Sequence, residues 1–197
     1  MIDASTKLRV ATPADSDAVS TLLAASYSSL LRERYASDTL DRTLPFMIGA
    51  NEKLLASGTY YVVEERPGNF VGCGGWTTAR PGSGEITDGE AHIRHFATHP
   101  KWMRRRIGTS LLARCFSDAR QLGIRKMHCF STLNAEWFYR ASGFDTVASI
   151  DVPMGPSLIS GGIDDPRACI ASPEWRRSRL MGQTRHFDRA PMTSGLP

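Results

Sequence analysis

Three consecutive arginines, Arg104, Arg105 and Arg106, stand directly before Ile107 and Gly108, where a helical pattern begins. Positive side chains are disfavoured there, because the unpaired N–H groups of a helix N-terminus already carry about half a positive charge. A bound anion would resolve this conflict, and the glycine would let the backbone approach it closely. The segment therefore predicts a pyrophosphate site. The alternative is that the arginines extend into water and the glycine only permits tight helix packing.

A second segment combines polar and aromatic side chains over residues 131–144, which read STLNAEWFYRASGF. Phe138 and Tyr139 stand near the end of a short predicted helix, and Gly143 and Phe144 follow at the entry to a strand. Such a pattern ordinarily means core packing followed by a helix stop. Taken alone, this segment predicts structure rather than chemistry.

Together and in this order, the two segments resemble the Gcn5-related N-acetyltransferase (GNAT) family, in which a strand, a phosphate loop and a helix precede a second strand and an FYxxxGF helix. The resemblance covers about residues 7–154, and its specific part is residues 91–147. The family loop typically reads Q/R-x-x-G-x-G/A. Here Met103 holds the first position and Arg106 the first glycine, so only Gly108 matches. The resemblance implies acetyl-CoA as cosubstrate, held at Arg104, Arg105, Arg106, Ile107, Gly108 and Thr109.

The resemblance also implies groups for acyl transfer from a thioester to an amine. Phe96, Ala97 and Thr98 would lie on a bulged strand, splayed from its parallel neighbour, and their backbone would pair with the pantetheine arm. The N–H of Phe96 would face the thioester oxygen. Tyr139 would protonate the departing sulfur, and Asn134 matches weakly the asparagine that many members carry nearby. The alternatives are that Phe96 is a core residue of a regular strand and that Tyr139 is a half-buried aromatic.

The strand expected over residues 91–98 also offers a base for the amine. Strand periodicity places His92 on the face of Phe96 and four residues before it, where some family members carry a glutamate base. An imidazole with an ordinary pKa near 6.5 is suited to accept an ammonium proton, directly or through water. Glu90 is the reserve candidate. The alternatives are that His92 is a surface or hydrogen-bonded residue and that a water chain carries the proton.

The elements that position these residues follow from capping signals and apolar periodicity. We expect helices over about 13–31, 38–55 with an interruption at Pro45, 107–122 and 134–142. We expect strands over about 8–11, 59–64, 70–77, 91–98, 126–131 and 144–152. The fold class is therefore α/β: a mixed, mostly antiparallel central sheet with a parallel splayed pair and flanking helices, which the resemblance identifies as the acyl-CoA N-acyltransferase fold.

Length and composition limit the remaining options. A chain of 197 residues and 21.7 kDa suits one domain, which we place at residues 1–158, with a poorly ordered, non-catalytic tail at 159–197. The last sheet edge would be incomplete or filled by 168–171, and an exposed edge predicts partial homodimerisation. The four cysteines show neither a CxxC pair nor metal spacing, so we expect free thiols and no metal. Without a leader or an apolar span, we expect a cytoplasmic protein and no membrane partner.

The leading interpretation is an N-acetyltransferase that acetylates a primary amine, on a small molecule or a peptide, by direct attack on the thioester. The alternative from another class is a non-catalytic CoA-binding sensor, because the first glycine of the loop is missing. A nucleic-acid binder using Lys101 and residues 104–106 is least supported, because its basic residues are few and only Trp102 interleaves with them.

Overall fold

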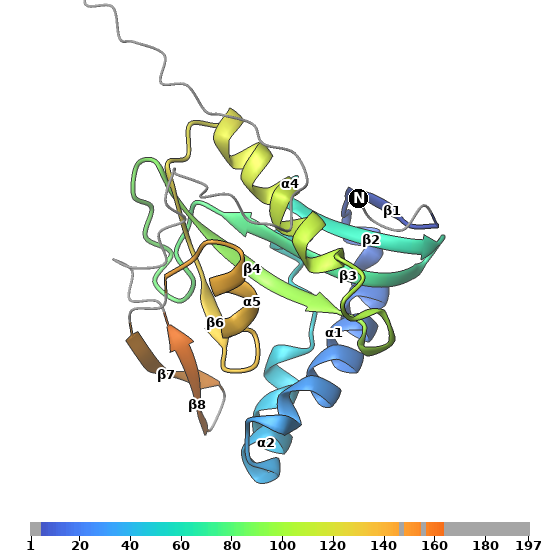
Figure 1. Ribbon diagram of the computed structural model, residues 1–197, viewed down its shortest axis with the longest axis vertical. Helices are drawn as coiled ribbons and strands as arrows, with labels where there is room; N and C mark the ends of the chain where they lie inside the picture. The colour runs from blue at the N-terminus through green and yellow to red at the C-terminus, as the bar shows by residue number, and fades with distance from the viewer. Residues whose placement is uncertain (1–4, 146–147, 155–156, 164–197) are drawn as a thin grey trace, which may run out of the picture.

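The computed structural model (Figure 1) describes residues 5–145, 148–154 and 157–163. A five-stranded sheet has the order β1-β2-β3-β4-β5, and a three-stranded sheet has the order β6-β8-β7. The strands of the large sheet are β1 (Lys7–Val10), β2 (Tyr60–Arg66), β3 (Asn69–Thr77), β4 (Glu90–Thr98) and β5 (Lys126–His128). Those of the small sheet are β6 (Phe130–Thr132), β7 (Ala148–Met154) and β8 (Ser157–Ile163).

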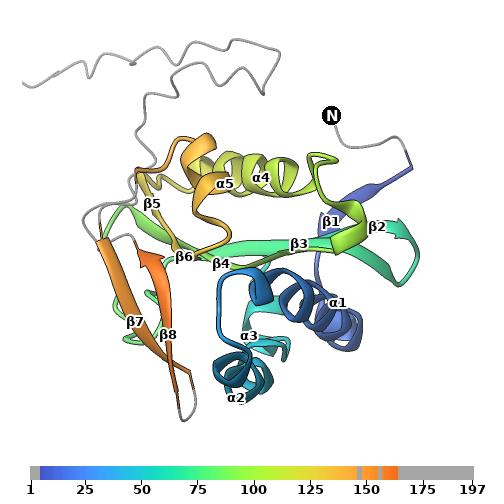
Figure 2. The ribbon, with the colours of Figure 1, turned by 60° about the horizontal axis from the view of Figure 1, so that its bottom comes forward.

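Helices cover both faces of the large sheet. They are α1 (Ser16–Leu30), α2 (Ser37–Met47), α3 (Glu52–Leu55), α4 (Ile107–Gln121) and α5 (Glu136–Ala141), with 3-10 turns at Pro13–Asp15, Leu31–Glu33 and Pro100–Trp102. Figure 2 shows α4 and α5 on one face and α1, α2 and α3 on the other. All strand pairs of this sheet are antiparallel except β4 with β5, which is parallel. The predicted fold class is confirmed.

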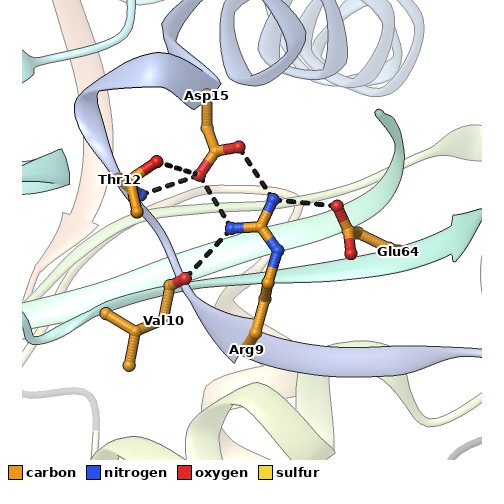
Figure 3. A network of polar contacts seen from close by, with 5 residues as sticks. All are labelled: Arg9, Val10, Thr12, Asp15 and Glu64. Atoms are coloured by element: carbon orange, nitrogen blue, oxygen red, sulfur yellow. Dashed lines mark hydrogen bonds and ion pairs between the residues drawn. The ribbon is translucent and has the colours of Figure 1, made fainter. Parts of the chain in front are cut away.

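An ion-pair network fixes the start of the first helix to the sheet (Figure 3). Two guanidinium nitrogens of Arg9 each lie 2.8 Å from a carboxylate oxygen of Asp15, and one of them also lies 2.8 Å from Glu64 on β2. Asp15 accepts the backbone N–H of Thr12 at 2.7 Å, as the capping sequence predicts. The hydrogen bonds from Arg9 lower the pKa of Asp15 to about 2.

Close packing of α4 on the sheet depends on glycines in β3. A Cβ at Gly72 would overlap Ile107 at the start of α4, and a Cβ at Gly74 would overlap the ring of Phe96 on β4. The predicted apolar face of α4 is buried from Ile107 to Ala119, but Leu122 is 68% exposed because the helix ends at Gln121. These glycines therefore let α4 and the Phe96 ring of β4 pack directly against the backbone of β3.

Three predicted boundaries were wrong. The second helix continues through Pro45 to Met47, and the break falls at residues 48–51, where Asn51 caps α3 by accepting the Leu54 N–H at 3.2 Å. The strand expected at 126–131 divides into β5 and β6, because the second half pairs with β8 in the other sheet. The strand expected from residue 144 begins at Ala148.

The incomplete sheet edge predicted after residue 158 was also wrong. β8 runs from Ser157 to Ile163 and pairs antiparallel with both β7 and β6. Gly161 and Gly162 interrupt the apolar alternation but still supply ladder positions, opposite Thr132 and Ser131 of β6. The open edge that predicted dimerisation is therefore filled by β8. The strand considered at 168–171 and the rest of the expected tail lie outside the described residues.

Within the described part of the chain, no helix has the length and apolar character needed to cross a membrane. The described cysteines Cys73, Cys115 and Cys129 are buried, and none of the three forms a disulfide within the described part of the chain.

Candidate active site

The two parallel strands separate halfway along β4. Pairing with β5 runs from Glu90 opposite Lys126 to His92 opposite His128, whereas β4 itself continues to Thr98. The chain after β5 turns away to join the small sheet as β6. Among the described strands, none pairs with this edge of β4 beyond His92. The splayed pair expected from the sequence is therefore present.

A bulge lies in the part of β4 that pairs with β3 but not with β5. Cys73 opposes Ala97 but Gly75 opposes Arg94, so two β4 residues, His95 and Phe96, face one residue of β3. The carbonyl of His95, whose φ is +46°, accepts the Tyr60 hydroxyl at 2.9 Å. The Phe96 carbonyl accepts the Tyr27 hydroxyl of α1 at 3.4 Å. Hydroxyls from β2 and α1 thus hold the bulge in place.

The loop before α4 adopts the conformation that glycines normally supply. Arg104 has φ +61° and Arg106, the residue before the helix, has φ +62°. The first backbone bond of the helix is from the Ser110 N–H to the Arg106 carbonyl, at 2.9 Å. The N–H groups of the three residues before Ser110, residues 107–109, have no backbone acceptor among the described residues. The departure from the family glycine therefore leaves the helix start open to an anion.

The charges around this helix start are unbalanced. Arg104, Arg105 and Arg106 are exposed, and none lies within 4.0 Å of a carboxylate oxygen in the described ranges. The guanidinium of Arg105 lies 4.5 Å from the centre of the Trp102 ring, and the first turn of α4 contains no acid. Guanidinium groups and helix N-termini both favour anions. The site suits a phosphate group.

Gly108 joins three elements at this site. A Cβ there would lie 3.2 Å from the Phe138 ring of α5 and 3.9 Å from Thr98 Oγ1 at the end of β4, so the contact is already tight. Asn134, just before α5, has a buried side-chain oxygen without a hydrogen-bond partner in the described structure. An N–H group of a ligand would satisfy it. Thr109 follows half-buried in the first turn of α4.

Tyr139 lies beside the bulge, where the sequence interpretation needs it. Its side chain is 6% exposed, and its ring centre lies 6.4 Å from that of Phe96. Edge contacts with Phe138 at 5.0 Å and Phe144 at 5.4 Å fix the ring. The structure therefore brings the FYxxxGF helix against the splayed edge of β4.

His92 and Glu90 share one face of β4, together with a histidine that the sequence analysis missed. His128 of β5 stacks on His92 with ring centres 5.1 Å apart, and its Nε2 lies 2.9 Å from Glu90. Lys126 donates to the same carboxylate at 3.1 Å. The parallel register that places residue 128 beside residue 92 was the missing signal.

The surroundings of His92 and Glu90 set the protonation state of each side chain. Burial, with the nearby His128, Arg80 and Arg94, lowers the pKa of His92 to about 4. Burial raises the pKa of Glu90, but the hydrogen bonds from Lys126 and His128 outweigh it, so that pKa is lowered overall. His92 is therefore neutral and Glu90 ionised near pH 7. Nδ1 of His92 and Nδ1 of His128 are both buried without a partner in the described structure.

Across the described ranges, no group of three or more His, Cys, Asp or Glu side chains is placed to hold a metal ion.

The candidate residues fall into two sets. One surrounds the start of α4 and the β4 edge, and the other lies on the opposite face of β4 around His92. The predicted shared face of His92 and Phe96 was therefore wrong, because the bulge at His95 and Phe96 shifts the alternation and packs Phe96 with Ala91 and Ile93.

Comparisons with known proteins agree with this geometry. A Gcn5-related N-acetyltransferase from Rhodopseudomonas palustris superposes with a TM-score of 0.65 at 18% identity, covering 82% of this chain and 94% of that one. The PaiA N-acetyltransferase from Thermoplasma acidophilum, solved in complex with coenzyme A, gives 0.57 at 15% identity, covering 81% and 99%. At these identities the likeness shows the fold.

Sequence comparison gives a distant relative and a match to a family model over part of the chain. An amino-acid acetyltransferase of Aeromonas salmonicida is 28% identical over 94 residues, which are 48% of this chain and only 20% of that protein. Residues 56–146, from the residues before β2 to those after α5, match the family model of the acetyltransferase (GNAT) domain. Residues 56–146, a little under half of the chain, are therefore similar to the GNAT acetyltransferase domain, and the solved structures show the same fold.

Proposed function

We propose that the protein is an acetyl-CoA-dependent N-acetyltransferase that acetylates a primary amine by direct attack on the thioester. The observation that carries the proposal is that, among the described residues, the edge of β4 beyond His92 has no strand partner and the arginines at the neighbouring helix N-terminus have no acidic partner. The coenzyme A complex of the PaiA relative and the name of the Aeromonas relative support it.

The residues at the start of α4 would hold the cosubstrate. The N–H groups of Ile107, Gly108 and Thr109 would bind the diphosphate, with charge from Arg104, Arg105 and Arg106. The backbone of Phe96, Ala97 and Thr98 would take the place of a strand partner for the pantetheine arm. The unpartnered oxygen of Asn134 would accept an N–H of the same arm. A buried carbonyl oxygen without a partner costs about 1–3 kcal/mol, so such an acceptor favours binding.

Acetyl-CoA, when bound, supplies the acetyl group as a thioester. The Phe96 N–H would donate to the thioester oxygen as negative charge develops, a contribution of about 3 kcal/mol where the donor is preorganised. Tyr139 would give its hydroxyl proton to the sulfur as the C–S bond breaks. Because a thiolate leaves readily at its ordinary pKa near 8.5, the loss of Tyr139 slows the reaction without abolishing it.

The amine nitrogen forms the new C–N bond and must lose a proton. His92 would accept it, directly or through water, because its ring is neutral near pH 7; its pKa of about 4 makes it a weaker base than an ordinary imidazole and favours transfer onward through water. Glu90 already accepts from Lys126 and His128, so its role is to position His128 rather than to act as the base. The proton returns to solvent after product release.

Thiol release from acetyl-CoA tests the proposal, with mass spectrometry of the products over amines, polyamines, aminoglycosides and peptide N-termini. We expect an acetylated amine in step with released thiol, and a roughly 10- to 100-fold lower kcat in Tyr139→Phe with little change in the KM for acetyl-CoA. Trp137→Phe is the control, because Trp137 is the 80% exposed neighbour of Tyr139 on the same helix. Binding of acetyl-CoA without turnover across the panel would instead establish the sensor function.

A further inference from the structure

Two arginines gather around His92 on the side of β4 where the base would work. Arg94 of β4 donates to Thr77 Oγ1 at 3.0 Å. The guanidinium of Arg80 lies 6.0 Å from the centre of the Phe130 ring, and that ring stacks parallel to His92 at 6.4 Å. The His92 ring, the Phe130 ring and the Arg80 guanidinium therefore follow one another in a single stack.

The charges in this cluster do not cancel. Neither Arg80 nor Arg94 lies within 4.0 Å of a carboxylate oxygen among the described residues. The neighbouring acid is Glu90, and its two oxygens are engaged by Lys126 and His128. Arg94 is half-buried, and burial lowers its pKa because the guanidinium has lost water. A partly buried cation without an opposite charge is unfavourable, and a bound anion removes the penalty.

This cluster lies away from the predicted phosphate site. Ala91 and Ile93 of β4 pack in the core beneath α4, so the residues that alternate with them, His92 and Arg94, face the side of α1 and α2 that Figure 2 shows on the other face of the sheet. The start of α4 lies on the other face. Arg80 and Arg94 are therefore not needed for the phosphates of the cosubstrate.

We propose that Arg94 and Arg80 bind a carboxylate of the acceptor, so that the substrate is an amine that carries a carboxylate, as an amino acid does. This inference rests on the proposed N-acetyltransferase function. A guanidinium binds a carboxylate through two parallel N–H bonds, which fixes its orientation as well as its charge. The carboxylate would then hold the amine near His92 and the splayed edge of β4.

Matched acceptors test this inference: free amino acids against their carboxamides, which keep the amine and lose the negative charge. We expect the wild type to favour the free acids by about 10- to 100-fold in kcat/KM. Arg94→Gln should raise the KM for the acids about tenfold or more and bring the ratio toward one, with the KM for acetyl-CoA unchanged. Arg80→Gln should act in the same direction, and Arg66→Gln, at the exposed end of β2, should change nothing.

The outcomes separate the two proposals. Equal or better acetylation of the carboxamides would overturn the carboxylate site while the N-acetyltransferase function stands. Preference for phosphorylated amines over carboxylates would overturn it as well. If no amine is acetylated, the proposed function fails, and calorimetric titration of amino acids into protein saturated with coenzyme A still decides the inference: binding lost in Arg94→Gln supports it, and no binding overturns it. Thermal unfolding shows that each variant is folded.

Discussion

The two faces of β4 differ in the kind of group that they present: backbone N–H groups beside α4 on one face, and side chains around His92 on the other. At the start of α4, the groups that we propose to contact the cosubstrate directly are backbone N–H groups, with the exposed arginines adding charge, and a left-handed Arg106 takes the place of a glycine. Around His92, every group is a side chain: Glu90, His128, Arg80 and Arg94. A site made of backbone tolerates a changed sequence as long as the conformation stays. A site made of side chains sets specificity, and each replacement changes it.

Filling the space at Gly108 is expected to have the largest effect. In Gly108→Val the new side chain must displace the Phe138 ring, which would lie 3.2 Å from the Cβ. Overpacking of this kind costs about 1–3 kcal/mol of folding stability, and the displaced ring and the shifted backbone of residues 107–109 should also weaken acetyl-CoA binding, by roughly tenfold or more. Calorimetric titration measures it. Gly49→Val is the control because a Cβ at Gly49 meets nothing within 4 Å. Unchanged affinity in Gly108→Val would show that the cosubstrate lies elsewhere.

The His92 side is expected to respond to pH. The pKa of His92 in the folded protein is about 4, against about 6.5 when unfolded, so the unfolded chain takes up the proton first as pH falls. The free energy of unfolding should therefore decrease between pH 6.5 and 4, by about 3 kcal/mol for this residue alone. His92→Gln should flatten this slope in urea titrations at several pH values. His95, whose pKa burial and Arg94 also lower to about 4, should keep part of it. An unchanged slope would contradict the buried, neutral His92.

The smallest expected effect concerns the loop itself. A non-glycine residue in the left-handed region costs about 1–2 kcal/mol, so Arg106→Gly should raise the free energy of unfolding by about 1 kcal/mol after the entropy of glycine is counted. Arg105→Gly should give no such gain, because φ of Arg105 is not positive. Urea unfolding at pH 7 compares them. Equal effects in the two variants would mean that the loop stores no strain at Arg106.

Most of the fold could be predicted because capping signals and apolar periodicity are local. The helix start at Thr12, the β2–β3 hairpin and α4 are where they were expected. The division of one strand into β5 and β6 could not be predicted, because it depends on β8, which lies about 30 residues further along the chain. β8 itself was missed because Gly161 and Gly162 hide its alternation.

The candidate site divides in the same way. Phe96 lies beside Tyr139 and Gly108 lies beside Phe138, an arrangement that the family resemblance implied from two local motifs. His128 was missed because only the parallel register brings it to His92. The grouping of Arg80 with His92 likewise depends on contacts between strands that are distant in sequence.

Amide hydrogen exchange with and without coenzyme A tests the central claim most directly. If backbone groups at the splayed edge of β4 and the start of α4 hold the cosubstrate, binding should slow exchange at residues 96–98 and 107–109 more than elsewhere. The exposed end of the β2–β3 hairpin, at the amides of Arg66, Gly68 and Asn69, serves as the internal reference. Binding that leaves the amides of residues 96–98 and 107–109 unchanged and protects another region would contradict the account.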